Sequence, residues 1–340
     1  MKQTADDISV IICAYTEKRW NDLVAAVDSV QQQTRSPREI IVVVDHNSDL
    51  LKRVRERIPC VLAIENQEAK GLSGARNSGA LTAKCAVVAF LDDDAIAEPD
   101  WIENLVECYK DPYVVGAGGK IEPLWLETRP SWFPDEFGWV VGCTYLGMPK
   151  QKASVRNVIG ANMSVQRQVL MAVGGFREYF GCNHDNISNS SAPNGFKWLQ
   201  HHAGDEETEF CIRVAQQRPE SIWLYTPHAI IRHRVPAQRT RWTYFLWRCY
   251  DEGLGKATLV GLHGTQAGLS SERTYTFKVL PRGIMCGLKD ALRHRDLTGL
   301  ARAGAIVLGL TLTGAGYTIG SISRLLVESK GGHHESAIGL

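Results

Sequence analysis

Residues 86–94 read AVVAFLDDD, so an apolar run ends in three adjacent carboxylates. Adjacent carboxylates repel one another unless a cation or a proton intervenes. At the carboxyl end of a buried strand, where open α/β sheets bind their ligands, such a group is typical of a hard-metal site that also holds phosphate oxygens. The alternative is a solvated acidic turn before the helix that begins at Pro99.

Strands and helices alternate on the amino-terminal side of this run. Short β-branched runs at 8–13, 40–44 and 61–64 predict three more buried strands, and each is followed by a segment of helical character. This alternation predicts an α/β, Rossmann-like fold with a mostly parallel central sheet flanked by helices. From Val114 the pattern loosens into a strand and then an aromatic stretch, which suits either a small core or a surface for stacking on a sugar ring.

Composition limits the class of protein. The chain has 340 residues, of which 44% are hydrophobic, so it can bury a large core. Its 38 basic and 37 acidic residues nearly cancel, and we expect no nucleic-acid partner. Nine cysteines without metal-site spacing, and an amino terminus without an apolar signal, predict a reduced, cytoplasmic protein.

One uncharged segment departs from a plain soluble pattern. Residues 303–322 contain no charged side chain and lie between Arg302 and Arg324, a length sufficient to span a bilayer. Two interpretations stay open. The segment either lies on or in a membrane, or packs on the domain or on a second subunit of a homodimer.

A second acidic group, Asp205-Glu206-Glu207 with Glu209, opens another expected helix. Carboxylates in a first helical turn are favoured by the helix dipole, which is the structural alternative. Displacing a nucleoside diphosphate from a sugar needs two acidic groups, one bound to a divalent cation and one that removes the acceptor's proton. Residues 92–94 suit the first role. Glu206 and Glu207 suit the second, because crowded carboxylates have pKa values pushed apart.

The segment 230–236 reads IIRHRVP, and its single imidazole, His233, is a candidate metal ligand or a structural residue at a strand end. Arginines and aromatic residues crowd the span that follows, 234–248. Some of these guanidinium groups would face a diphosphate, since their planar fork suits phosphate oxygens. The alternative is a basic amphipathic helix laid on acidic lipid or on the sheet.

Together these motifs resemble the family 2 glycosyltransferases, nucleotide-sugar enzymes of the type A fold. The matching segments are VIICAY (10–15), VVDHNS (43–48), GLSGARNSG (71–79), FLDDD (90–94), GANM (160–163), GGF (174–176), EETEFCIR (206–213) and His233. They follow in the order expected for the family and cover about residues 8–256.

The resemblance implies a role for each matching residue. Donor-binding residues would be Ala14, Tyr15, Glu17, Asp45, Gly71, Arg76, Asp92 and Asp93, with Asp45 at the nucleobase and ribose and Arg76 near the diphosphate. Asp94 and His233 would bind Mn²⁺ or Mg²⁺. Glu207 falls at the position of the catalytic base, where the family commonly has Asp, and Glu206 and Asp205 are the alternatives. Family members invert the anomeric centre in a single in-line displacement.

Residues 238–242, QRTRW, also match the Gln-x-x-Arg-Trp motif of processive polysaccharide synthases. Those enzymes carry several spanning helices, whereas this chain has at most one candidate, so we expect single additions. Arg241 and Trp242 would then lie beside the diphosphate and the acceptor.

These inferences predict one large domain with an extension. Residues 1–120 would bind the nucleotide sugar, 121–258 would supply the acceptor and catalytic half, and 259–340 would form a C-terminal helical extension with peripheral membrane contact. The expected reaction is transfer from a UDP-linked sugar to a glycan or lipid-linked acceptor at the inner face of the plasma membrane. The alternatives are a sugar nucleotidyltransferase and a non-catalytic glycan- or nucleotide-binding module.

Overall fold

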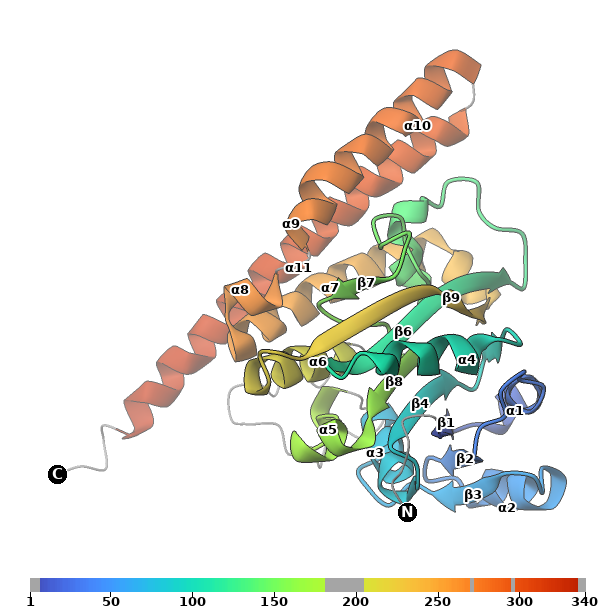
Figure 1. Cartoon of the computed structure of the whole chain (residues 1–340). Helices are drawn as coiled ribbons and strands as arrows, with labels where there is room; N and C mark the ends of the chain where they lie inside the picture. Colours follow the sequence, from blue (N-terminus) through green and yellow to red (C-terminus); the bar gives the residue numbers. More distant parts are fainter. Residues whose placement is uncertain (1–6, 181–204, 270–271, 295–296, 336–340) are drawn as a thin grey trace.

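A single curved sheet with helices on both faces forms the centre of the molecule (Figure 1). The computed structural model describes residues 7–180, 205–269, 272–294 and 297–335. The strands in these residues are β1 (Ile8–Ala14), β2 (Glu39–Val44), β3 (Leu62–Glu65), β4 (Val87–Asp92), β5 (Ala95–Ala97), β6 (Val114–Trp125), β7 (Ala153–Val155), β8 (Asn162–Gln166) and β9 (Ile222–Val235). Their order across the sheet is β3-β2-β1-β4-β8-β6-β9-β5, with β7 paired to β9.

The amino-terminal half confirms the predicted βα repeats. Strands β3, β2, β1 and β4 are parallel neighbours. The connecting helices are α1 (Trp20–Gln31), α2 (Ser48–Arg57) and α3 (Leu72–Thr82). Successive residues of β1 point to opposite faces, with Val10 and Ile12 in the core under α1 and α2, and Ile11 in the core under α3. Because both faces of β1 are buried, this strand is apolar along almost all of its length.

The second half of the sheet mixes directions. Strand β8 lies antiparallel between β4 and β6, while the long pairing of β6 with β9 is parallel. The helical elements here are α4 (Trp101–Val106), η2 (Glu107–Lys110), η3 (Asp135–Val141), α5 (Arg167–Ala172), η4 (Glu178–Phe180), α6 (Glu206–Gln217) and η7 (Ala237–Thr240). As the sequence indicated, a strand follows Val114, although it extends to Trp125.

The aromatic stretch after β6 is a small core. Phe133 and Phe137 are buried and contact the ring of Phe245, and Trp132 stacks on Trp242 with 3.9 Å between ring centroids. These rings therefore form a small core, which is one of the two interpretations that the sequence left open. Residues 181–195 are rich in Asn and Ser, for which we expect a loop, and they lie outside the described residues.

Three long helices follow β9 and η7: α7 (Trp242–His263), α10 (Leu280–His294) and α11 (Leu297–Glu335). The short elements α8 (Thr265–Gly268), α9 (Glu272–Thr274) and η8 (Tyr275–Val279) lie between α7 and α10. Helix α11 packs along α7 and α10. A side chain at Gly253 or Gly316 would collide with the facing helix backbone, so small residues permit the α7–α11 crossing. The apolar segment at 303–322 thus packs on the domain along one face.

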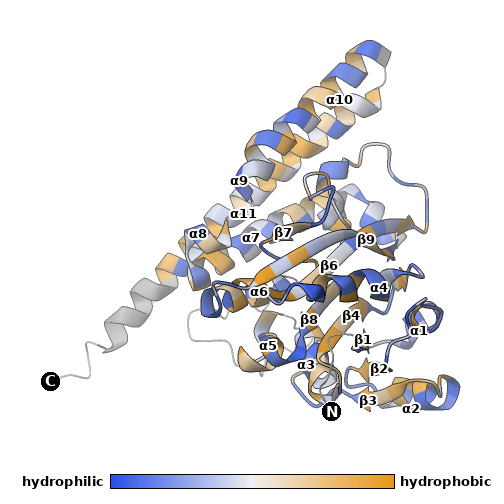
Figure 2. Cartoon of the chain, in the orientation of Figure 1, coloured by the Kyte–Doolittle hydropathy of each residue, from blue (hydrophilic) through white to orange (hydrophobic). Residues whose placement is uncertain are grey.

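We call residues 272–294 and 297–326 the arm. Helix α10 and the part of α11 beside it project away from the sheet (Figure 1), and the rest of α11 lies along α7. Within the described residues, one helix, over Leu297–Leu326, is long and apolar enough to cross a membrane. The other face of α11 keeps Val307, Leu308, Ile319 and Ile322 exposed, and apolar and polar bands alternate along the arm (Figure 2).

Candidate active site

A cavity of about 260 Å³ opens at the carboxyl ends of β1, β2 and β4. The predicted residues that line it are Ala14, Tyr15, Asp45, Gly71, Asp92, Asp93, Asp94 and His233. Each comes from the end of a strand or from the loop that follows one, as expected for ligand binding by an open α/β sheet. We call it the donor cavity.

The pairing of β5 with β9 brings His233 to the carboxylates. β5 begins directly after Asp94, and its Ala95 lies opposite His233 in the antiparallel ladder. The backbone N–H of Arg234 donates to the carbonyl of Asp94 at 2.9 Å, and Nε2 of His233 lies 3.2 Å from Oδ1 of Asp94. Burial alone would raise the pKa of Asp94, but the His233 hydrogen bond and nearby positive charges lower it to about 2.

The donor atoms of Asp92, Asp94 and His233 fit a divalent cation. One ligand atom from each lies within 4.8 Å of the others, which gives two carboxylate oxygens and an imidazole nitrogen. This set suits Mn²⁺ or Mg²⁺. The buried Nδ1 of His233 and Oδ2 of Asp93 have no hydrogen-bond partner among the described residues. The cluster therefore keeps unused polar atoms for a ligand.

Two further arginines line the donor cavity: Arg19, which we did not single out from the sequence, and Arg239, one of the arginines of residues 234–248 that we expected in part to face a diphosphate. Arg19 contacts Asp93 at 2.9 Å and Asp94 at 3.1 Å. It follows the first strand by five residues, and the turn η1 (Glu17–Arg19) directs it back to the carboxylates. Burial raises the pKa of Asp93 to about 7, although the Arg19 charge opposes this shift. Arg239, from η7, lies near His233 and contacts the carbonyl of Val141.

The Asp45 carboxylate is fixed by its neighbours. Oδ1 accepts from Asn66 at 2.7 Å, and Oδ2 accepts from the backbone N–H of Gly71 at 3.0 Å. Gly71 has a φ of 133°, a conformation that favours glycine, so a side chain here would disturb this contact. Asp45 is thus rigidly oriented at the wall of the donor cavity.

Arg76 joins the two acidic groups that the sequence places more than a hundred residues apart. Its guanidinium lies 2.9 Å from Oε1 of Glu206 and 3.6 Å from Oδ1 of Asp92. The residue is only 2% exposed, so this ion pair is buried. The carboxylates of β4 and those of α6 therefore converge on one region of the molecule, as the two-group hypothesis requires.

Glu207 faces a second cavity of about 420 Å³, formed by α6, α7, η8, α11 and the loops around Trp139 and Arg156. Burial raises the pKa of Glu207 to about 8, the charge of Glu206 adds to this effect, and Arg76 opposes it. Burial and the Glu252 charge raise the pKa of Asp205, on the same wall, to about 7. A carboxyl with a pKa near neutrality suits proton transfer.

Comparison with known proteins agrees with this geometry. Residues 9–174 match the family model for glycosyl transferase family 2. A glucosyl-dolichyl phosphate glucuronosyltransferase from Haloferax volcanii is 32% identical over 325 residues, which cover 94% of this chain and 98% of the relative. The chain belongs to glycosyltransferase family 2. This membership decides for glycosyl transfer over the nucleotidyltransferase and the binding-module alternatives.

Two further similarities are informative. An Escherichia coli UDP-Glc:alpha-D-GlcNAc-diphosphoundecaprenol beta-1,3-glucosyltransferase is 37% identical over 92 residues, 26% of this chain and 35% of the relative. The fold resembles that of a Pyrobaculum calidifontis mannosyltransferase in complex with GDP-Man and Mn²⁺. The TM-score is 0.51 at 15% identity, with 95% of this chain and 86% of the other covered.

Four predicted donor-site residues of this family 2 enzyme do not line the donor cavity, and one of them is the buried Arg76 described above. Glu17 lies in η1 outside it, Arg241 is exposed, and Trp242 stacks on Trp132 at the start of α7. Arg239 of the same QRTRW segment reaches the cavity instead. The roles of Arg241 and Trp242 beside diphosphate and acceptor stay predictions.

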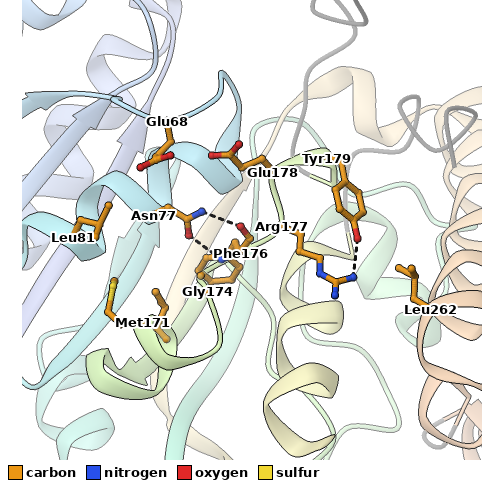
Figure 3. A pocket seen from close by; sticks show the side chains of 12 residues that line it. Glu68, Asn77, Leu81, Met171, Gly174, Phe176, Arg177, Glu178, Tyr179 and Leu262 are labelled. Carbon is orange, nitrogen blue, oxygen red and sulfur yellow. Dashed lines mark hydrogen bonds between the residues drawn. The ribbon is translucent and has the colours of Figure 1, made fainter. Parts of the chain in front are cut away.

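A third cavity, of about 620 Å³, is lined by a different set of residues, which includes Asn77, Phe176, Arg177 and Tyr179 (Figure 3). Asn77, from the GLSGARNSG segment, donates to the carbonyl of Phe176 at 2.9 Å and accepts from its N–H at 2.8 Å. Arg177 donates to the hydroxyl of Tyr179 at 2.7 Å. Two motifs of the family thus hold each other in place here, and none of the predicted catalytic residues lines this cavity.

Proposed function

We propose that this glycosyltransferase moves a sugar from a nucleotide-diphosphate donor, UDP-linked, to a hydroxyl of a lipid-linked glycan, with inversion and with a divalent cation. The observation that carries the proposal is the Arg76 bridge between Asp92 and Glu206, which joins the donor cavity to the wall that holds Glu207. Relatives named for dolichyl-phosphate and diphosphoundecaprenol acceptors support the acceptor class.

On the donor side, Asp92, Asp94 and His233 would hold Mn²⁺ or Mg²⁺, which when bound neutralises the charge of the leaving diphosphate. Asp45 and the backbone of Ala14 and Tyr15 orient the nucleoside. Arg19 and Arg239 are the cations of this cavity, and their guanidinium groups suit diphosphate oxygens.

On the acceptor side, the ionised Glu207 carboxylate takes the proton from the attacking hydroxyl. The acceptor oxygen, deprotonated by Glu207, forms a bond to the anomeric carbon from the side opposite to the nucleoside diphosphate, which leaves with the electron pair of the broken C–O bond, so the displacement inverts the centre in one step. Glu206 remains bound to Arg76, and its charge adds to the burial that raises the pKa of Glu207.

We also propose that the arm contacts the cytoplasmic face of a membrane. Its described residues include seven basic and two acidic side chains, although the whole chain is nearly neutral. Met285, Leu288 and Leu292 are exposed on α10, together with the basic Lys289 and Arg293. Basic charge beside exposed apolar residues suits an anionic bilayer, where a lipid-linked acceptor resides. A homodimer stays a prediction.

The test begins with the donor. We would screen a panel of nucleotide sugars by thermal shift with and without Mn²⁺, and then measure transfer to short polyprenyl-phosphate-linked sugars. We expect a metal-dependent shift with one donor, and transfer that yields the inverted anomer by NMR. A retained anomeric configuration, or binding that does not depend on the metal, would contradict the proposal.

A further inference from the structure

The second cavity has the features of a carbohydrate site. Its walls come from α6, α7, η8 and α11, so helices from distant parts of the sequence enclose it. Its volume of about 420 Å³ is within the ordinary range for small-molecule pockets. Because Glu207 forms part of the wall, a hydroxyl bound here lies beside the base.

One side of this cavity is aromatic and held in place. The hydroxyl of Tyr275 donates to the carbonyl of Glu136 at 2.7 Å, and Nε1 of Trp139 donates to the Tyr275 hydroxyl at 3.1 Å. The ring of Tyr145 meets that of Tyr275 edge to face. Rigid aromatic faces suit the apolar face of a sugar ring.

Another side is a network of ionic groups. Nζ of Lys256 lies 2.9 Å from Glu252 and 2.8 Å from Glu272, and Arg156 lies 3.1 Å from Glu272. Such a network offers acceptors and donors side by side, as the hydroxyl groups of a sugar require.

The charged side chains on the wall of the second cavity indicate whether a neutral or an anionic sugar binds there. The cavity wall holds three cations, Arg156, Arg248 and Lys256, and two carboxylates, Glu252 and Glu272, besides Asp205 and Glu207, whose pKa values are raised to about 7 and about 8. Because each of these three cations already has a carboxylate partner, an anionic sugar would gain no new ion pair here and would oppose ionisation of Glu207, whereas a neutral sugar would not.

Asp205 is unusual among these residues. Its φ of 67° is left-handed, a conformation that costs energy for a residue other than glycine. Its carboxylate packs against Gly255, where a side chain would collide with it. Within the described part of the chain, neither a hydrogen bond nor an ion pair engages this carboxylate. The left-handed backbone thus places at the cavity wall a carboxyl group that makes no side-chain hydrogen bond to the described residues.

We propose that the second cavity binds a neutral terminal sugar of the acceptor, and that Asp205 is a specificity-determining residue that accepts hydrogen bonds from its hydroxyl groups. This inference rests on the proposed function. The apolar remainder of the acceptor leaves along Leu310, Gly314 and Tyr317 of α11, which line the same cavity.

The discriminating variant is Asp205→Gly. Glycine adopts the left-handed conformation without strain, so the melting temperature is expected to stay equal or to rise. Loss of a charge-assisted hydrogen bond is expected to raise the acceptor KM by at least about tenfold, with the donor KM measured in the same assay. Asp205→Asn, which tolerates this backbone and keeps an oxygen acceptor, should show a smaller rise. Glu107→Gln, which removes an exposed carboxylate of η2, is the matched control.

Binding is measured separately from transfer, with octyl glycosides of neutral hexoses and the matching octyl glucuronide, below their micelle concentrations, by ligand-observed NMR. We expect a neutral glycoside to bind the wild type more tightly than the glucuronide, and Asp205→Gly to weaken it. An unchanged acceptor KM and unchanged glycoside binding in Asp205→Gly would overturn the inference, as would tighter binding of the glucuronide or no glycoside binding at all. A wild-type enzyme that binds glycosides in this way but transfers no sugar would instead overturn the proposed function.

Discussion

Replacing Glu207 by Gln is expected to slow transfer by orders of magnitude and, at the same time, to stabilise the protein at neutral pH. Burial raises the pKa of this carboxyl from 4.5 to about 8. Because the pKa is higher in the folded state, the unfolded chain loses this proton first as pH rises. The free energy of unfolding therefore falls between pH 4.5 and pH 8. At about 1.4 kcal/mol per pH unit, the loss reaches about 3 kcal/mol at pH 7.

Glutamine has no proton to lose, so the stability difference between variant and wild type should grow from near zero at pH 4.5 to about 3 kcal/mol at pH 7. Urea denaturation at intervals of pH measures this slope, and Glu107→Gln should follow the wild type. Transfer should fall by about 10²- to 10⁴-fold with donor binding retained. Parallel stability curves would refute the buried-acid reasoning. Normal transfer by Glu207→Gln, with none by Glu206→Gln, would assign the base to Glu206.

Three other perturbations follow from the same contacts. Asp94→Ala should abolish the Mn²⁺-dependent thermal shift by the donor, while a shift equal to that of the wild type would remove Asp94 from the metal site. Arg76→Met leaves two carboxylates without their shared buried partner, so it should lower the free energy of unfolding, measured by urea denaturation, by about 3–5 kcal/mol. A decrease smaller than that caused by replacing an exposed arginine would contradict the bridge. Lys289→Glu with Arg293→Glu should weaken sedimentation with phosphatidylglycerol vesicles by at least about tenfold, and equal binding at low salt would argue against membrane contact.

Much of the donor side could be predicted because its determinants are local. Each β-branched run ends where its strand ends, and a parallel sheet brings those ends to one edge. The positions of Asp45 and of residues 92–94 in the donor cavity follow from this rule. Arg19 was missed because a single turn of 3-10 helix, which carries no periodicity, directs it back to the carboxylates.

The remainder depends on contacts between distant segments. The three-residue strand β5 is too short to recognise from the sequence, yet its pairing with β9 places His233 beside Asp94. The second cavity joins α6 to α11, and residue spacing along either helix does not indicate that the other one faces it. The left-handed backbone conformation of Asp205 has no signal in the sequence.

The wall that α11 contributes to the second cavity has a consequence for the length of a functional chain. The segment that matches the family model ends at residue 174, before Glu207 and well before Leu310. A protein shortened after β9 would keep every group of the donor cavity except Arg239, but Glu207, the base that we propose, would face bulk water. Such a fragment would hydrolyse its donor, so helix α11 favours transfer of the sugar to the acceptor over transfer to water.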